Sequence, residues 1–167
     1  MSIKETLIDS IKKAMQGEMD SVTLYQNAAD HTPDEEVKQF FLSRRDEEKL
    51  HYNFLLKQYQ DLANDREPGD MIAEMKAHEE KHPMFTENFI KRIGQDQYLF
   101  SAISTALLLE KNAIDHYRKS AADTEIATLR AFFKFLEEWE TVHYNDLLAI
   151  QKDAEQHYWD INKFEPF

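Results

Sequence analysis

Two stretches of the chain carry the same arrangement of potential metal ligands. Glu18 is followed 30 residues later by Glu48, and His51 comes three residues after Glu48. The arrangement recurs 92 residues further along the chain, at Glu110, Glu140 and His143. Residues three apart on a helix project from the same face, so each Glu-x-x-His pair can aim a carboxylate and an imidazole at one point.

Four carboxylates and two imidazoles form a ligand set suited to iron, manganese and, less often, zinc. Two lone glutamates with two Glu-x-x-His pairs are the ligands of carboxylate-bridged dinuclear sites in four-helix bundles. Burying four carboxylates without compensation would be costly, and two divalent cations would neutralise them. We therefore predict two metal ions, with iron as first choice because redox chemistry would explain the aromatic residues nearby.

Each of the six residues has an expected role as a metal ligand and candidate catalytic residue. In this interpretation Glu48 and Glu140 bridge the two ions. The remaining four supply terminal or bridging carboxylates and one imidazole for each ion, namely Glu18, Glu110, His51 and His143. A third Glu-x-x-His pair, Glu79 to His82, has no partner at the repeat distance and precedes Pro83. We interpret it as a surface coincidence.

Four further side chains lie close to the proposed ligands in sequence. Tyr25 and Tyr117 follow the lone glutamates by seven residues, two turns along the same helix face. They could hydrogen-bond a ligand carboxylate or relay electrons, and the alternative is simple core packing. Asp20 and Asn112 also share the repeat distance and could support a ligand histidine. The alternative for these two is a solvated surface position.

The repeat extends well beyond the ligands. When residues 7–61 are shifted by 92 positions, 16 of 55 residues are identical, whereas ordinary amino-acid frequencies would give roughly 4. A repeat of this length corresponds to a helical hairpin, and two hairpins make one bundle. We therefore expect a ferritin-like, all-α, antiparallel four-helix bundle with one long crossover between its second and third helices.

The helices of this bundle can be placed from apolar periodicity and from turn residues. Residues 32–35, Thr-Pro-Asp-Glu, are typical of an N-cap at Thr32 followed by a proline in the first turn. We expect one domain over residues 1–154, with helices at about 3–31, 34–64, 96–122 and 125–154. Residues 65–95 form the crossover, with short helical segments near 72–80 and 85–93. The aromatic tail, residues 155–167, is expected to pack against the bundle.

Composition narrows the function classes further. The net charge of -12 argues against nucleic acid as a partner. The absence of cysteine excludes disulfides, thiol catalysis and iron–sulfur ligation within these residues. Neither an apolar signal region nor a membrane-spanning stretch is evident, so we expect a cytoplasmic protein that does not bind membranes. A homodimer is compatible with these properties.

The two ligand segments also resemble a known family. Glu110-Lys-Asn-Ala-Ile-Asp-His-Tyr117 and Glu140-Thr-Val-His-Tyr144, together with the lone glutamates, resemble the ferritin-like superfamily. Within it, residues 3–154 are most similar to the di-iron domain of the rubrerythrin family. This resemblance implies a di-iron oxidoreductase that reduces hydrogen peroxide or dioxygen, with a role in oxidative stress.

Two departures from the rubrerythrin pattern bear on activity. Family members usually carry a cysteine-rich rubredoxin-like module, so here the electrons would come from a separate donor. They also usually carry a glutamate three residues after the third-helix ligand, where this chain has Ala113, which predicts slower peroxide turnover. Two alternatives stay open: an iron-handling ferroxidase or storage protein, and a metal-binding protein without catalysis.

Overall fold

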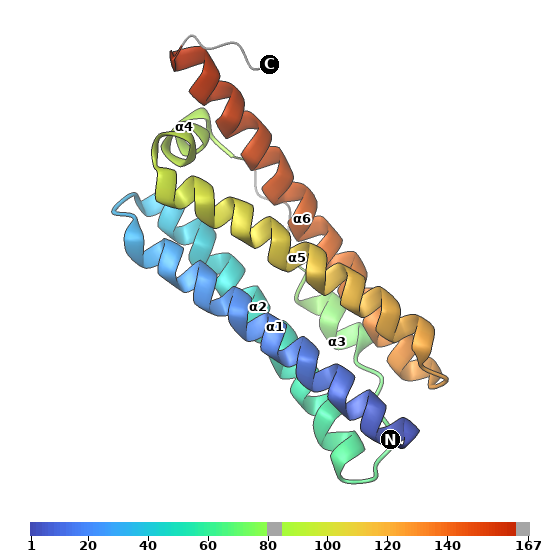
Figure 1. The fold of residues 1–167 in the computed structure, drawn as a ribbon. Helices are drawn as coiled ribbons and strands as arrows, with labels where there is room; N and C mark the ends of the chain where they lie inside the picture. The colour runs from blue at the N-terminus through green and yellow to red at the C-terminus, as the bar shows by residue number, and fades with distance from the viewer. Residues whose placement is uncertain (80–84, 163–167) are drawn as a thin grey trace.

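A computed structural model describes residues 1–79 and 85–162 of the chain. The described residues form six helices, α1 (Ile3–His31), α2 (Glu35–Ala63), α3 (Ile72–Ala77), α4 (Glu87–Gln95), α5 (Gln97–Asp123) and α6 (Ala127–Asn162). The four long helices pair as two antiparallel hairpins, α1 with α2 and α5 with α6, and the hairpins lie side by side (Figure 1). The predicted all-α, ferritin-like bundle is therefore confirmed.

The two hairpins point in opposite directions. Figure 1 shows the α1–α2 turn and the α5–α6 turn at opposite ends of the bundle. The chain between α2 and α5 returns along the bundle and contains the two short helices, of which α4 packs against α6, α5 and α2. This arrangement brings the middle of each long helix to the same level, and the repeated glutamates lie at that level.

The helix starts follow ordinary capping chemistry, with one change from the expected position. Ser2 caps α1 in a capping box with Glu5. The N-cap of α2 is Asp34, whose carboxylate accepts a hydrogen bond from the Val37 amide at 3.0 Å. The predicted cap at Thr32 is wrong, because Thr32 ends α1 and its hydroxyl accepts from the Asp34 amide. Asp is the stronger capping residue, and it directly precedes the helix.

The apolar core consists of two clusters, one on each side of a polar layer in the middle of the bundle. On α1, Ile11 belongs to one cluster and Ala28 to the other, with Glu18 buried between them. Each of α2, α5 and α6 also contributes residues to both clusters, and its buried Glu and His residues lie between those two sets. Burial of these apolar clusters at both ends forces the intervening Glu and His side chains into the interior.

The last helix is longer than the sequence predicted. α6 continues to Asn162, about two turns past the expected end near residue 154. Residues 155–162 contain neither Gly nor Pro, and Gln156 donates a hydrogen bond to Asp160 one turn later at 2.8 Å. Tyr158 and Trp159 stack edge to face on this extension. The rest of the predicted tail, residues 163–167, lies outside the described residues.

Two smaller expectations can also be compared with the structure. Glu79, from the third Glu-x-x-His pair, is exposed, while His82 lies outside the described residues. In the described part of the chain, none of the helices combines the length and apolar character that a membrane crossing requires.

Candidate metal centre

The six residues singled out by the repeat all lie in the polar layer at the middle of the bundle. They are 0–3% exposed and come from all four long helices, namely Glu18 on α1, Glu48 and His51 on α2, Glu110 on α5, and Glu140 and His143 on α6. Amphipathic helices bury one face, and here that face carries a carboxylate or imidazole in place of an apolar side chain. The fold thus gathers side chains that lie up to 125 residues apart in sequence.

The cluster divides into two overlapping groups, each able to hold a metal ion. One group consists of Glu18, Glu48, His51 and Glu140, and the other of Glu48, Glu110, Glu140 and His143. Within each group the candidate ligand atoms lie within 4.8 Å of one another. Glu48 and Glu140 belong to both groups, so each could be shared by two ions.

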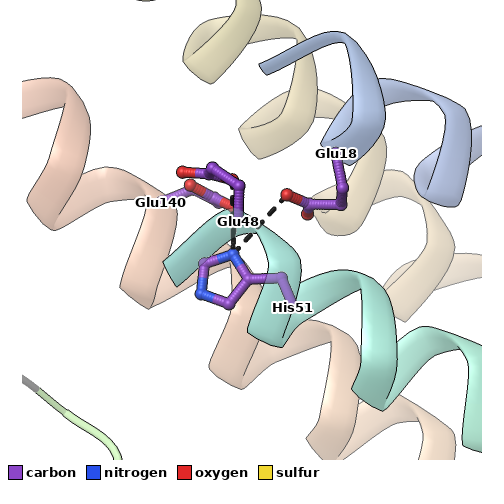
Figure 2. A group of neighbouring side chains, drawn as sticks. All are labelled: Glu18, Glu48, His51 and Glu140. Atoms are coloured by element: carbon purple, nitrogen blue, oxygen red, sulfur yellow. Dashed lines mark hydrogen bonds and ion pairs between the residues drawn. The ribbon is translucent and has the colours of Figure 1, made fainter. Parts of the chain in front are cut away.

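Each histidine turns its Nδ1 atom toward three carboxylates. Nδ1 of His51 lies 2.8 Å from Oε1 of Glu140, 3.5 Å from Oε2 of Glu48 and 3.6 Å from Oε2 of Glu18. Figure 2 shows the His51 ring facing these three side chains. The second ring repeats this geometry, with Nδ1 of His143 at 3.1, 3.2 and 3.8 Å from oxygens of Glu48, Glu140 and Glu110.

A divalent cation beside each Nδ1 atom would satisfy the surrounding carboxylates better than a proton on that nitrogen. A ring nitrogen carries at most one proton, which can serve only one carboxylate at a time. Oε2 of Glu140, for example, is buried 3.2 Å from Nδ1 of His143 and has no hydrogen bond among the described residues. A divalent cation beside each Nδ1 would contact the ring and the surrounding carboxylates together and would neutralise the buried negative charge. The residues present therefore fit a dinuclear metal centre.

The pKa directions show how the cluster balances its charge without metal. Burial raises the pKa of Glu18 and of Glu110 well above the usual value, and the carboxylate of Glu140 raises both further. Burial acts to lower the pKa of both histidines, but the facing carboxylates outweigh it and raise both well above the usual range. Proton binding is therefore favoured at Glu18, Glu110 and both rings relative to the same groups in water.

The two shared glutamates titrate in the opposite direction. Burial acts to raise the pKa of Glu140, but the His51 charge and hydrogen bonds from both histidines hold it well below the usual value. Burial also acts to raise the pKa of Glu48, and hydrogen bonds from Glu18 and the histidines lower it overall. The charged form is thus favoured at the two shared carboxylates, which face the two histidine rings.

Two tyrosines hold the unshared carboxylates across the interface between the hairpins. The Tyr25 hydroxyl on α1 donates to Oε1 of Glu110 on α5 at 2.6 Å. The Tyr117 hydroxyl on α5 donates in turn to Oε1 of Glu18 on α1. Both rings are also buried in the apolar clusters, so these tyrosines combine core packing with a hydrogen bond to the cluster.

Asp20 and Asn112 lie away from the histidines. Both side chains are exposed, and Asp20 accepts a hydrogen bond from Gln16 at 2.9 Å. They line the rim of a pocket between α1 and α5. Asp20 and Asn112 therefore occupy solvated surface positions, since they project from the outer side of their helices.

That pocket reaches from the surface to the polar layer. It has a volume of about 290 Å³, and ligand-position residues Glu18, Glu48 and Glu110 contribute to its lining. Small residues, including Gly17 and Ala113, line it as well and leave the space between α1 and α5 open. A small molecule can therefore approach the carboxylates without displacing a helix.

The sequence interpretation missed one residue beside the cluster. Glu47 is 4% exposed, and its Oε2 contacts Nε2 of His143. Arg44 donates to Glu47 at 2.9 Å and to Asp146 at 2.8 Å. The only signal in the sequence is a charged pair three residues apart on a helix, which ordinarily indicates an exposed face.

Comparison with known families agrees with this geometry. A sequence profile of the Rubrerythrin family matches residues 9–151, which include both halves of the repeat and all six clustered residues. The chain belongs to the rubrerythrin family. This ferritin-like family consists of di-iron carboxylate proteins, and the buried Glu/His cluster fits a di-iron site. Searches of curated proteins and of solved structures gave no significant match.

Proposed function

We propose that this rubrerythrin-family protein is a di-iron oxidoreductase that reduces hydrogen peroxide or dioxygen with electrons from a separate donor. The observation that carries the proposal is the pair of overlapping groups that share Glu48 and Glu140 beneath a pocket. Two redox-active ions held by these overlapping groups could act together on one small oxidant.

The choice of iron follows from the donor atoms and from the family. Carboxylate oxygens and imidazole nitrogens suit iron or manganese. In the proposal Glu48 and Glu140 would be shared by both ions, while Glu18 with His51 and Glu110 with His143 would complete the two positions. Bound iron would supply the electrons that reduce the O–O bond.

The protein itself positions the ligands and controls access. Tyr25 and Tyr117 fix the orientation of the unshared carboxylates by hydrogen bonds. The apolar clusters above and below the polar layer exclude bulk water, which strengthens electrostatic interactions inside it. The pocket between α1 and α5 admits an oxidant the size of peroxide. Because the chain has no cysteine, it cannot supply an iron–sulfur or rubredoxin-type electron relay from its own residues.

Anaerobic loading with ferrous iron followed by oxidation tests the proposal. We expect two ferrous ions per chain to be oxidised per molecule of peroxide, since its reduction to water takes two electrons and two protons. Continued consumption of peroxide should require an added reductant. Protein loaded with zinc is the matched control, because it fills the same ligands without redox chemistry.

Two results would contradict the proposed activity. Iron uptake well beyond two ions per chain, with no sustained peroxide or dioxygen consumption, would favour the iron-handling alternative. Stable binding of two ferrous ions that neither oxidant oxidises would favour a metal-binding protein without catalysis.

A further inference from the structure

The two histidines of the cluster have different surroundings on their outer side. Nε2 of His143 faces the carboxylate of Glu47, which Arg44 holds by a buried ion pair. Arg44 is itself 5% exposed and also binds Asp146. His143 is thus backed by three linked charged side chains.

The outer side of His51 is apolar. Its Nε2 atom is buried and has no hydrogen-bond partner in the described structure. The edge of the ring packs against Trp139, with ring centroids 4.5 Å apart and an angle of 72° between the rings. Packing therefore orients this side of the ring, and no acceptor among the described residues holds a proton on Nε2.

The internal repeat shows that this difference is systematic. The residues that back His143 are Arg44, Glu47 and Asp146. Their counterparts at the repeat distance of 92 residues are Leu136, Trp139 and Phe54, all of which belong to one apolar cluster. The repeat keeps all six ligand positions, but the three charged residues on the His143 side have apolar counterparts, of which Trp139 contacts the His51 ring.

This difference has a direct consequence for metal binding. A hydrogen bond from Nε2–H to a carboxylate fixes the ring tautomer that offers the Nδ1 lone pair to a metal, and it increases the basicity of Nδ1. Loss of such a partner typically lowers metal affinity by about 10–100-fold. Nε2 of His143 forms an ion pair with the Glu47 carboxylate, whereas no carboxylate among the described residues pairs with Nε2 of His51.

We propose that the two metal positions are unequal and that Glu47 produces the difference. The His143 position, made by His143 with Glu48, Glu110 and Glu140, binds a divalent cation first. The His51 position, made by His51 with Glu18, Glu48 and Glu140, binds second and more weakly. Glu47 is a positioning residue, since it acts through the His143 ring. The inference rests on the metal centre of the proposed function and is independent of peroxide reduction.

Calorimetric titration of the metal-free protein with cobalt(II) or zinc(II) tests this inference without any redox step. The wild-type protein should bind two ions in two steps whose dissociation constants differ by about 10–100-fold. Glu47→Gln keeps the side-chain size and removes the charge, so the first step should weaken about tenfold or more while the second changes little. Asp46→Asn is the matched control, because Asp46 neighbours Glu47 but is 62% exposed and pairs with Arg45.

A second measurement uses the wild-type protein alone, in case Glu47→Gln does not fold. Crystals grown with one equivalent of cobalt(II) should show anomalous density at the His143 position and little at the His51 position. Equal density at both positions, a single binding step for two equal ions, or equal effects of Glu47→Gln and Asp46→Asn would overturn the inference. Two equal ions would leave the proposed oxidoreductase intact, whereas absence of any metal binding would contradict both.

Discussion

The Tyr25 hydroxyl on α1 lies 2.6 Å from Oε1 of Glu110 on α5, so a tyrosine of one hairpin holds a carboxylate of the other. Because Glu110 belongs to only one of the two ligand groups, this bond orients a carboxylate that no second ion would hold in place. The interface between the hairpins and the geometry of the candidate centre are therefore coupled.

Tyr25→Phe should destabilise the metal-free protein. It leaves a buried carboxyl oxygen without its donor, and the free energy of unfolding should fall by about 1–3 kcal/mol. Urea denaturation measures this change. Tyr52→Phe is the control, because Tyr52 is only partly buried, and its effect should stay within about 0.5 kcal/mol. Equal losses in both variants would show that the hydrogen bond to Glu110 contributes no specific stability.

Substitutions at shared and unshared glutamates should affect metal content differently. Glu18 belongs to one ligand group and Glu140 to both. Glu18→Ala should therefore leave about one tightly bound ion per chain, while Glu140→Ala should weaken both positions. Elemental analysis after dialysis measures the content. The exposed Glu79→Ala is the control and should retain the wild-type content. If Glu18→Ala and Glu140→Ala lose the same amount, the assignment of Glu140 as a bridge is wrong.

The stability of the metal-free protein should fall as the pH rises, whereas the stabilisation produced by metal should increase. Folding raises the pKa of His51 and His143 above the usual 6.5, so the folded protein keeps protons that the unfolded chain releases. The stability from these rings is complete below pH 6.5 and is lost as the pH rises through their folded pKa. Glu18 and Glu110, whose pKa is also raised, contribute the same sign from pH 4.5 upward.

Metal binding displaces these protons, so affinity should increase over the same pH range. The rise in melting temperature produced by zinc should be larger at about pH 8 than at about pH 6. Scanning calorimetry with and without zinc measures it. A zinc effect that is constant across this range would mean that the rings and carboxylates do not hold protons in the metal-free protein.

Ala113→Glu should increase the rate of peroxide reduction if the proposed activity holds. Ala113 lines the pocket one turn from Glu110, so the new carboxylate would lie beside the unshared ligand. Stopped-flow oxidation of the iron-loaded protein measures the rate, and metal analysis checks that two ions remain. An unchanged rate at full metal content would show that residue 113 does not limit the reaction.

The two helical glycines should respond oppositely to alanine. A Cβ atom at Gly17 would meet nothing within 4 Å, and Gly17→Ala should raise the free energy of unfolding by about 0.5–1 kcal/mol. A Cβ atom at Gly94 would lie 2.8 Å from the carbonyl oxygen of Ala154. Gly94→Ala should therefore force α4 and α6 apart and cost about 1–3 kcal/mol. Urea denaturation of the two variants should show shifts of opposite sign.

The sequence by itself determined the hairpins, their crossover and the six clustered residues. Helix periodicity is a local property that can be recognised in the sequence. The constant repeat distance shows that Glu18 and Glu110 are equivalent positions, even when the fold is unknown. The extent of α6 beyond residue 154 was less predictable, since helix ends depend on the surrounding structure as well as on local residues.

Only the tertiary structure decided the contacts between helices. Helix rotation and side-chain rotamers decide three features of the cluster. They bring the Tyr25 hydroxyl to Glu110, place Glu48 and Glu140 in both ligand groups, and turn Nδ1 of each histidine inward. Glu47 illustrates the limit most clearly. In sequence it is one more charge in an acidic helix, and it becomes the partner of His143 only when α2 and α6 pack together and exclude water from the pair.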